Sequence, residues 1–328
     1  MLKLKWLLVA ALVVIVGGGL WFTNSALPFA SPGREVVVRV VAGDSVATVA
    51  NKLEDAHVVA SALAFRVDVA VFGSLLIQPG YYELHEHSSH ADIRAILSSV
   101  PNAQAVTIFP GATIRQIARQ MTTVEGARYA GSWQRLALGT AVPAFGSVNY
   151  EGLLGVGMYV IGPHEDPRAL LARMEQRFVA QLAHLGITPS STIHGLSAYR
   201  FVIATSIVEK EGYYATNMPK VARVILNRLQ RGGGLQMDAT VLYYLDKDGV
   251  KVTPGMLQLS TPYNTYKHAG LTPTPICQVS AVALRAMLHP PVGSWLYFVV
   301  VDKAGTEAFA TTYAEHLRNV ELARSRGL

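Results

Sequence analysis

Residues 201–212, with the sequence FVIATSIVEKEG, join an uncharged run to two glutamates. As a helix this segment has almost no polar face, so most of its sides must be buried. Gly212 directly follows the glutamates, as a glycine often does at a helix end. Burial without a cationic partner raises the pKa of a carboxyl group toward values that suit a general acid. The segment therefore predicts a central helix with a candidate acid at its end.

Glu209 and Glu211 both fit this role. With a period of 3.6 residues, Glu209 shares a stripe with Thr205 and Ser206, whose hydroxyls could line a cleft beside it. Glu211 shares a stripe with Ile207 and could turn back toward water. Two solvated charges at a helix terminus are the alternative interpretation. Spacing alone does not choose between the two carboxyl groups.

The composition indicates a folded protein without disulfides. The 328 residues are 51% hydrophobic and 15% charged, which predicts two soluble units plus an anchor. The net charge of +6 comes from scattered Lys and Arg without interleaved aromatic residues, so we expect no nucleic-acid binding. A basic excess suits an anionic membrane or an acidic polymer instead. Cys277 is the single cysteine, and its apolar neighbours predict burial rather than catalysis.

The N-terminus carries a membrane signal. Residues 6–22, WLLVAALVVIVGGGLWF, are uncharged and follow Lys3 and Lys5. At ~1.5 Å per residue the run spans about 25 Å. It predicts a transmembrane anchor over residues 1–23 with the N-terminus in the cytoplasm, followed by a Pro/Gly/Ser linker at 24–33. A cleaved signal peptide is the alternative, because small residues follow the run.

An internal repeat follows the linker. Residues 38–53 and 106–121 align without a gap, with Gly43 over Gly111 and Ser45 over Thr113. Each copy predicts a strand, a glycine turn and a capped helix. We expect the two copies to pack together in a small α+β module over residues 34–125. Three histidines between them, at positions 85, 87 and 90, lack an ordered metal-ligand spacing, so we expect no metal site.

The second half predicts a larger α+β domain over residues 148–328. Asp166 and Pro167 open one helix, residues 219–231 form another, and the apolar run 295–301 is typical of a central strand. The loops 235–240, 262–266 and 270–276 are rich in amides, hydroxyls and tyrosines, which suit a sugar site. His316 is alone on the last helix and is expected to be structural.

Taken together, these stretches resemble the MltG/YceG family of membrane-anchored endolytic murein transglycosylases. The resemblance implies an α+β chain with an N-terminal membrane helix, a small LysM-like module and a larger catalytic domain. The motifs that carry it are SIVEKE at 206–211, VILNRL at 224–229, LQMDATV at 235–241, YNTY at 263–266, the segment from Gly270-Leu271 to Pro275-Ile276, and Tyr297-Phe298.

The resemblance implies cleavage of the β-1,4 bond between N-acetylmuramic acid and N-acetylglucosamine within peptidoglycan strands, leaving 1,6-anhydro ends. A single glutamate serves as general acid and base, because the sugar supplies its own attacking hydroxyl. The resemblance assigns this role to Glu209 and implies no cofactor. We expect these residues to bind the substrate: Gln236, Asp238, Thr240, Tyr263, Asn264, Thr265, Tyr266 and Glu151.

The resemblance also implies a location and partners. The location is a single-pass position in the bacterial inner membrane, with the catalytic domain in the periplasm. The partners are peptidoglycan synthases of the elongation or division machinery. Four departures from the family pattern affect the groove. Residues 155–158 lack the usual Pro-Asp-Thr, Ala239 replaces a usual proline, Thr272 and Thr274 stand in the usual L-P-P-G-P-I segment, and Glu307 stands where a histidine is usual. Alternatives are a hydrolytic muramidase, with Glu151 or Asp238 as second carboxylate, and a non-catalytic peptidoglycan-binding scaffold.

Overall fold

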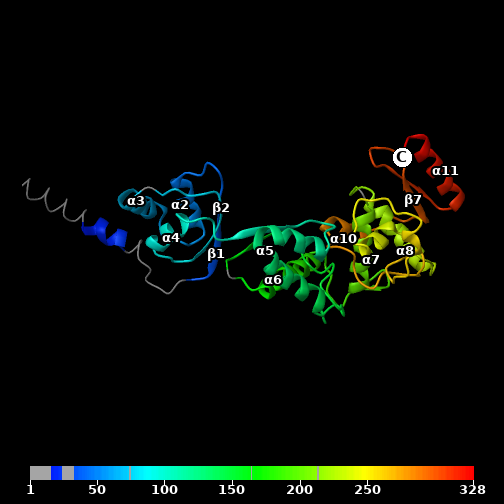
Figure 1. Cartoon of the computed structure of the whole chain (residues 1–328), viewed down its shortest axis with the longest axis horizontal. Coiled ribbons are helices and arrows are strands. Elements are labelled where there is room, and N and C mark those ends of the chain that lie inside the picture. The colour runs from blue at the N-terminus through cyan, green and yellow to red at the C-terminus, as the bar shows by residue number, and fades with distance from the viewer. Residues whose placement is uncertain (1–15, 24–32, 74, 164, 213) are drawn as a thin grey trace, which may run out of the picture. The chain divides into compact units, whose positions relative to one another are not determined.

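The structure is a computed structural model that describes residues 16–23, 33–73, 75–163, 165–212 and 214–328. The fold is mixed α+β, as predicted. The chain forms two compact units (Figure 1): unit 1 comprises Met1–Val106 and Tyr159–Glu165, and unit 2 comprises Thr107–Met158 and Asp166–Leu328.

Unit 1 is a small α+β unit with its own core. Strand β1 pairs antiparallel with β2, with Val38 opposite Tyr82. Alternate residues of β1 are buried, so one sheet face meets the helices and the other faces outward. The core contains Leu53 from α2, Phe65 from α3 and Ile93 from α4. The elements are β1 (Glu35–Val40), α2 (Val46–Asp55), α3 (Ala62–Phe72), β2 (Gly80–His85) and α4 (His90–Leu97).

The strand–turn–helix prediction for both repeat copies is confirmed. Gly43 and Gly111 have φ values of 92° and 77°, which favour glycine. Ser45 caps α2 and Thr113 caps α5 (Ile114–Gly139) through their side-chain oxygens. The copies do not form one module, however, because α2 belongs to unit 1 and α5 to unit 2. The local sequence determines each turn, but it does not determine which unit the following helix packs into.

The chain passes between the units within two paired strands, β3 (Gln104–Ile108) and β4 (Gly157–Ile161). The predicted end of the first module, residue 125, instead falls inside α5. That helix is kinked at Gly126, which has φ 80° and ψ 162°. Since the kink interrupts the apolar stripe, the sequence pattern did not reveal one long helix.

Most of the predicted anchor, residues 1–15, lies outside the described residues. Residues 16–23 are helical. Within the described part of the chain, no helix has both the length and the apolar content needed to cross a bilayer.

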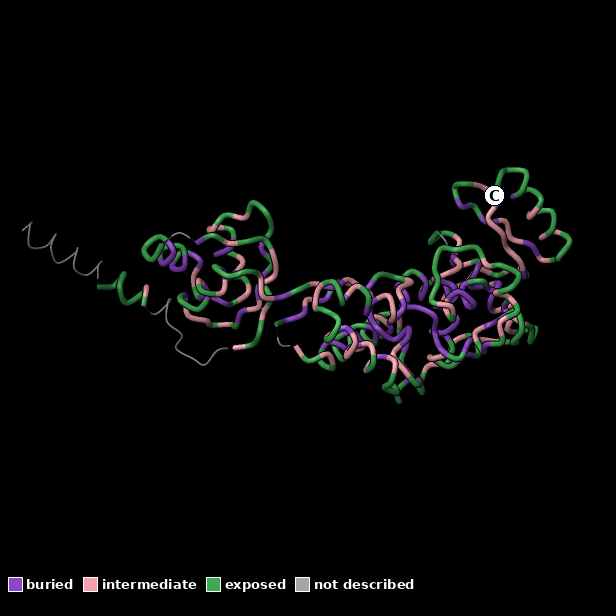
Figure 2. Tube along the Cα trace, in the orientation of Figure 1, coloured by how far each residue is buried: buried purple, intermediate pink, exposed green. Residues whose placement is uncertain are grey.

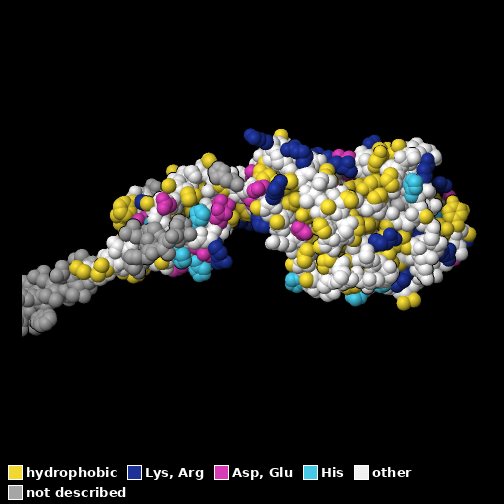
Figure 3. Space-filling model, turned by 90° about the horizontal axis from the view of Figure 1, so that it is seen from below, with side chains coloured by type: hydrophobic (Ala, Val, Ile, Leu, Met, Phe, Trp, Pro, Cys, Tyr) yellow, Lys and Arg dark blue, Asp and Glu magenta, His cyan; other side chains and the backbone are white. Residues whose placement is uncertain are grey.

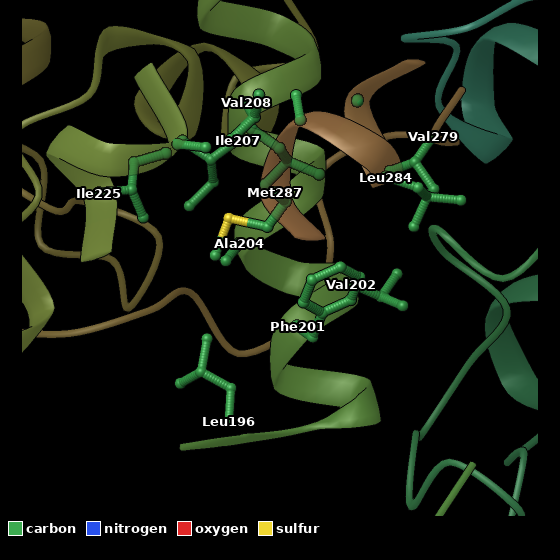
Figure 4. Close-up of a cluster of buried hydrophobic side chains, with 14 of the residues drawn as sticks. Leu196, Phe201, Val202, Ala204, Ile207, Val208, Ile225, Val279, Leu284 and Met287 are labelled. Carbon is green, nitrogen blue, oxygen red and sulfur yellow. The ribbon is translucent and has the colours of Figure 1, made fainter. Parts of the chain in front are cut away.

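Unit 2 is mainly helical, and α7 (Ala198–Glu211) lies at its centre. It packs against α8 and α10, and its buried side chains face residues of both helices, including Ile225 and Met287 (Figure 4). Figure 2 shows the same concentration of buried residues around this helix. The other elements are α6 (Pro167–Ala183), β5 (Thr192–Ile193), β6 (Leu196–Ser197), α8 (Met218–Gln230), α9 (Asp238–Tyr244), a 3₁₀ turn η1 (Met256–Gln258), α10 (Ala281–Leu288), β7 (Tyr297–Val300), β8 (Glu307–Ala310) and α11 (Tyr313–Ser325).

The predicted central helix is confirmed, and it ends before Gly212. Gly212 has a φ of −79°, so a left-handed conformation is not the reason for glycine here. A Cβ atom would lie 2.5 Å from Cγ of Met218, at the start of α8. The missing side chain therefore allows α8 to begin close beside the end of α7.

The apolar run at residues 295–301 does not form the predicted central strand. It forms β7, which pairs with β8 in a two-stranded sheet and whose four residues are half-buried. Helix α11 packs against this hairpin. An uninterrupted apolar run predicts burial on both faces only when another strand or helix covers each face.

Candidate active site

A cavity of 280 Å³ lies at the C-terminal end of α7. It combines one candidate acid, one guanidinium and several aromatic rings, which is a composition suited to a sugar. The residues that line it are Glu211, Arg228, Gln236, Met237, Asp238, Tyr266, Tyr297, Phe298, Tyr313 and His316.

Glu211 is the glutamate that the cavity contains. The pKa of its carboxyl group is raised to about 7, mainly by desolvation and in part by the charge of Asp238. The N–H of Ala239 donates a 3.0 Å hydrogen bond to Oε1, which favours the charged form and opposes this shift. A carboxyl group with a pKa near 7 can both release and accept a proton at neutral pH.

Arg228 brings a positive charge to the same cavity in a fixed position. Its Nε donates a 2.7 Å hydrogen bond to the carbonyl of Leu296, and its guanidinium also donates to the carbonyl of Leu235. The guanidinium lies 5.5 Å from the ring centroid of Tyr297. Backbone carbonyls thus hold the guanidinium of Arg228 in place. From this position its positive charge lowers the pKa of Glu211.

Three predicted substrate-binding residues share the cavity with Glu211. Gln236 and Asp238 are exposed, and the hydroxyl of Tyr266 donates a 2.6 Å hydrogen bond to Oδ1 of Asp238. Across the cavity, Tyr297 stacks on His316 with ring centroids 5.3 Å apart. Polar groups beside aromatic faces match the alternating O–H and C–H surfaces of a sugar ring.

Glu209 does not lie among these residues. Its Oε2 accepts a 2.8 Å hydrogen bond from the N–H of Ser280, which caps α10. It lines a different cavity of 630 Å³ together with Lys210, Asp248 and residues 109–112. The structure therefore separates Glu209 from the Gln236 and Tyr266 loops with which we expected it to act.

The hydroxyls on the Glu209 stripe do not line a cleft either. Thr205 and Ser206 are fully buried and donate hydrogen bonds to the carbonyls of Phe201 and Ile203, at 2.8 Å and 2.7 Å. Ser206 Oγ also accepts a hydrogen bond from the N–H of Ile276. Ser206 thus holds the loop around Cys277 against α7, and Cys277 is fully buried as predicted.

Four further predicted substrate-binding residues form the scaffold of the loops. Asn264 is fully buried and donates to the carbonyls of Leu257 and Leu259. Thr240 and Thr265 are buried and bonded to each other at 3.0 Å. The hydroxyl of Tyr263 lies 2.8 Å from the hydroxyl of Thr274. Their polar groups thus already bond within the protein, and none of the four residues lines the cavity of Glu211.

Glu151 is also misplaced by the sequence analysis, because it is fully buried in the structure. Its oxygens accept hydrogen bonds from the N–H of Ile114 (3.1 Å), from Tyr243 (3.1 Å) and from Gln278 (2.9 Å). Burial raises its pKa to about 7. Glu151 therefore ties the start of α5 to α9 and to the loop of Gln278, and it does not line the cavity of Glu211.

Glu307 is a second carboxyl group in electrostatic range of Glu211. It begins β8 and is only 9% exposed. Burial raises its pKa to about 7, and the charge of Glu211 contributes to this rise. Its Oε2 is buried and has no hydrogen-bond partner among the described residues. Two nearby carboxyl groups repel each other when both are charged, so one of them tends to keep its proton.

Sequence reasoning missed part of the cavity. Glu211 was considered but not chosen, and Arg228 and Tyr313 were not singled out. His316 was expected to be structural, and it lies in the cavity wall. The described residues contain no group of three or more His, Cys, Asp or Glu arranged to hold a metal ion.

Comparisons with known proteins give a consistent result. The model of the YceG-like family matches residues 38–322. The endolytic murein transglycosylase of Bacillus subtilis (strain 168) is 27% identical and aligns over 92% of this chain and 89% of its own length. The endolytic murein transglycosylase of Streptococcus pneumoniae serotype 2 is 25% identical over 90% of this chain, which spans 60% of that longer protein. A crystal structure of a putative YceG-like protein from Listeria monocytogenes has a TM-score of 0.52 and 25% identity, covering 87% of this chain and 98% of that one.

Proposed function

We propose that this chain, which belongs to the YceG-like family, is an endolytic murein transglycosylase that cleaves the glycan strands of peptidoglycan. The observation that carries the proposal is the position of Glu211, a carboxyl group with a raised pKa in a cavity lined by aromatic and polar side chains. The family relationship supports the substrate, and the cavity supports the chemistry.

Glu211 acts as both acid and base in this proposal. Its protonated form donates the proton to the glycosidic oxygen between N-acetylmuramic acid and N-acetylglucosamine as that bond breaks. The resulting carboxylate then removes the proton from the 6-hydroxyl of the same muramic acid, whose oxygen closes the 1,6-anhydro ring. Neither a nucleophilic carboxylate nor a water molecule is needed.

The surrounding side chains prepare this proton transfer. Asp238 and burial keep Glu211 protonated near neutral pH, and the Ala239 N–H stabilises the carboxylate once the proton has left. The positive charge of Arg228 also favours the carboxylate. The rings of Tyr266, Tyr297 and Tyr313 offer faces on which sugar rings can stack.

Product analysis tests this function. The full chain in detergent is incubated with purified peptidoglycan, and the products are examined by mass spectrometry. We expect 1,6-anhydro ends from within strands. Glu211→Gln should lower the cleavage rate by about 100-fold or more, the usual range for loss of a general acid or base, while Glu209→Gln should remain active.

Other outcomes would replace the proposal. Reducing ends would indicate hydrolysis, for which Asp238 is a second carboxylate in the same cavity. Binding of peptidoglycan without cleavage by the wild-type chain would indicate a scaffold. Cleavage by a folded Glu211→Gln variant would remove Glu211 from the catalytic role.

The location and the role of unit 1 are part of the same proposal. The uncharged run at residues 6–22, preceded by two lysines, supports a single-pass anchor in the bacterial inner membrane with the catalytic domain in the periplasm. The order strand, helix, helix, strand from β1 to β2, with antiparallel pairing, supports a LysM-like module. Peptidoglycan synthases are the partners that such a location suits.

A further inference from the structure

Helix α3 of unit 1 presents an apolar face to the outside. Leu63, Val67 and Val71 are 58%, 40% and 67% exposed and recur every four residues, so they form one stripe. Ala70 is exposed on the same side. Phe72 and Leu76, directly beyond the stripe, are 62% and 86% exposed. Figure 3 shows hydrophobic side chains at the end of unit 1 where α3 lies.

The opposite face of α3 is already occupied. Phe65 and Val69 are buried in the core of unit 1, and Ala62 and Ala64 are buried too. The helix is thus apolar on both sides, whereas the outer face of a surface helix is normally polar. The stripe is not needed to hold unit 1 together, and an exposed contiguous apolar surface usually marks an interaction site.

The charged residues of α3 are Arg66 and Asp68. Arg66 is exposed among the apolar residues. Asp68, the single acidic residue of α3, is buried and pairs with Arg94 at 3.0 Å. The guanidinium of Arg94 lies 4.8 Å from the ring centroid of the exposed Phe72. An apolar stripe that carries the exposed guanidinium of Arg66 fits the boundary between acyl chains and anionic headgroups.

The sequence before unit 1 limits how far it can lie from a bilayer. Twelve residues, 23–34, connect the uncharged run to β1. At about 3.5 Å per residue they span at most ~42 Å. Because this tether holds unit 1 beside the membrane, the effective concentration of lipid at the α3 face is high.

We propose that the exposed face of α3, comprising Leu63, Arg66, Val67, Ala70 and Val71 with the adjoining Phe72, docks onto the anionic lipid bilayer in which the chain is anchored. This inference rests on the anchoring part of the proposed function. Docking holds unit 1 at the membrane surface in addition to the covalent tether. It does not depend on Glu211 or on cleavage.

A depth measurement tests the docking with the full chain. Val71→Cys and Val37→Cys are each labelled with an environment-sensitive fluorophore and reconstituted into vesicles of phosphatidylglycerol and phosphatidylcholine that contain doxyl-labelled lipid. Val37 is the matched control, because it is 40% exposed on the outer face of β1, away from the helices. The native Cys277 is fully buried and is not labelled under native conditions. We expect at least threefold stronger quenching at position 71 than at position 37, and weaker quenching at position 71 in vesicles of phosphatidylcholine alone.

Each other result overturns the inference. Equal, weak quenching at both positions in protein that floats with the vesicles would show anchoring without docking. Energy transfer between chains labelled at position 71, without lipid quenching, would show that a second copy covers the stripe. Failure of the chain to float with vesicles would overturn both anchoring and docking, whereas glycan cleavage, measured separately, would still report on the proposed activity.

Discussion

The N–H of Ala239 donates a 3.0 Å hydrogen bond to Oε1 of Glu211, joining the end of α7 to the first turn of α9. The segment that leads into α9 also carries Gln236 and Asp238, which line the same cavity. One contact thus places the candidate acid next to the polar groups expected to hold the sugar. It also places Glu211 close to Asp238, whose charge raises its pKa.

Glu209 is expected to affect stability rather than catalysis. Glu209→Ala removes the acceptor of the Ser280 N–H at the start of α10 and should lower the free energy of unfolding by about 1 kcal/mol. Glu209→Gln keeps an acceptor oxygen and should cost less. Urea unfolding and the cleavage rate per folded molecule check both variants. Complete loss of cleavage in a folded Glu209→Gln protein would return the catalytic role to Glu209.

Asp238→Asn should shift the pH profile of cleavage. The charge of Asp238 raises the pKa of Glu211, so its removal should lower that pKa. Because the acid form of Glu211 starts the reaction, the alkaline limb of kcat/KM should move to lower pH. Tyr266→Phe serves as the control, since it removes the 2.6 Å hydrogen bond to Asp238 but keeps the carboxylate. We expect a higher KM for that variant, and an unmoved limb in Asp238→Asn would refute the coupling.

Glu307 should respond to loss of the charge on Glu211. Repulsion from Glu211 contributes to the rise of the pKa of Glu307 to about 7. In Glu211→Gln this repulsion is absent, so the pKa of Glu307 should fall below its wild-type value while burial still keeps it above the ordinary 4.5. Carbon-13 NMR titration of labelled glutamate side chains measures this change. An identical titration of Glu307 in both proteins would show that the two groups do not interact.

Glu151 should make the stability of unit 2 depend on pH. Its pKa is about 7 in the folded protein and 4.5 ordinarily, so between these values the folded state keeps a proton that the unfolded state has released. Stability should therefore fall as the pH rises through this window, by up to about 3 kcal/mol. Glu151→Gln should remove this contribution, so unfolding at pH 5 and pH 8 should differ less than in the wild type. An equal pH dependence in both proteins would contradict the assignment.

Local structure followed from local sequence wherever a short-range interaction decides it. The uncharged run before Glu209 predicted a buried helix, and Ser45, Thr113 and Asp166 predicted helix starts that the structure confirms. A capping side chain bonds to a backbone group two or three residues away, so its signal is visible in the sequence. The family motifs are equally local, and they include Gln236, Asp238 and Tyr266, which line the cavity.

Residues whose surroundings come from distant segments could not be predicted in this way. Asn264 and Thr265 look like ligand-binding side chains in the sequence, but their hydrogen bonds go to neighbouring loops. Glu151 was expected to bind the substrate, yet α5 and the loop of Gln278 enclose it. A polar residue in a loop has no periodicity that shows whether its partner is protein or solvent.

The sequence by itself determined that a buried helix ends in two glutamates and that the chain carries the motifs of a peptidoglycan-cleaving family. Only the tertiary structure decided which glutamate meets the cavity. Residues two apart on a helix point about 200° away from each other, so Glu209 faces the start of α10 and Glu211 faces α9. Which of these directions leads to the cavity of Gln236 and Tyr266 depends on where α8, α9 and the β7–β8 hairpin pack, and no residue within the helix carries that information.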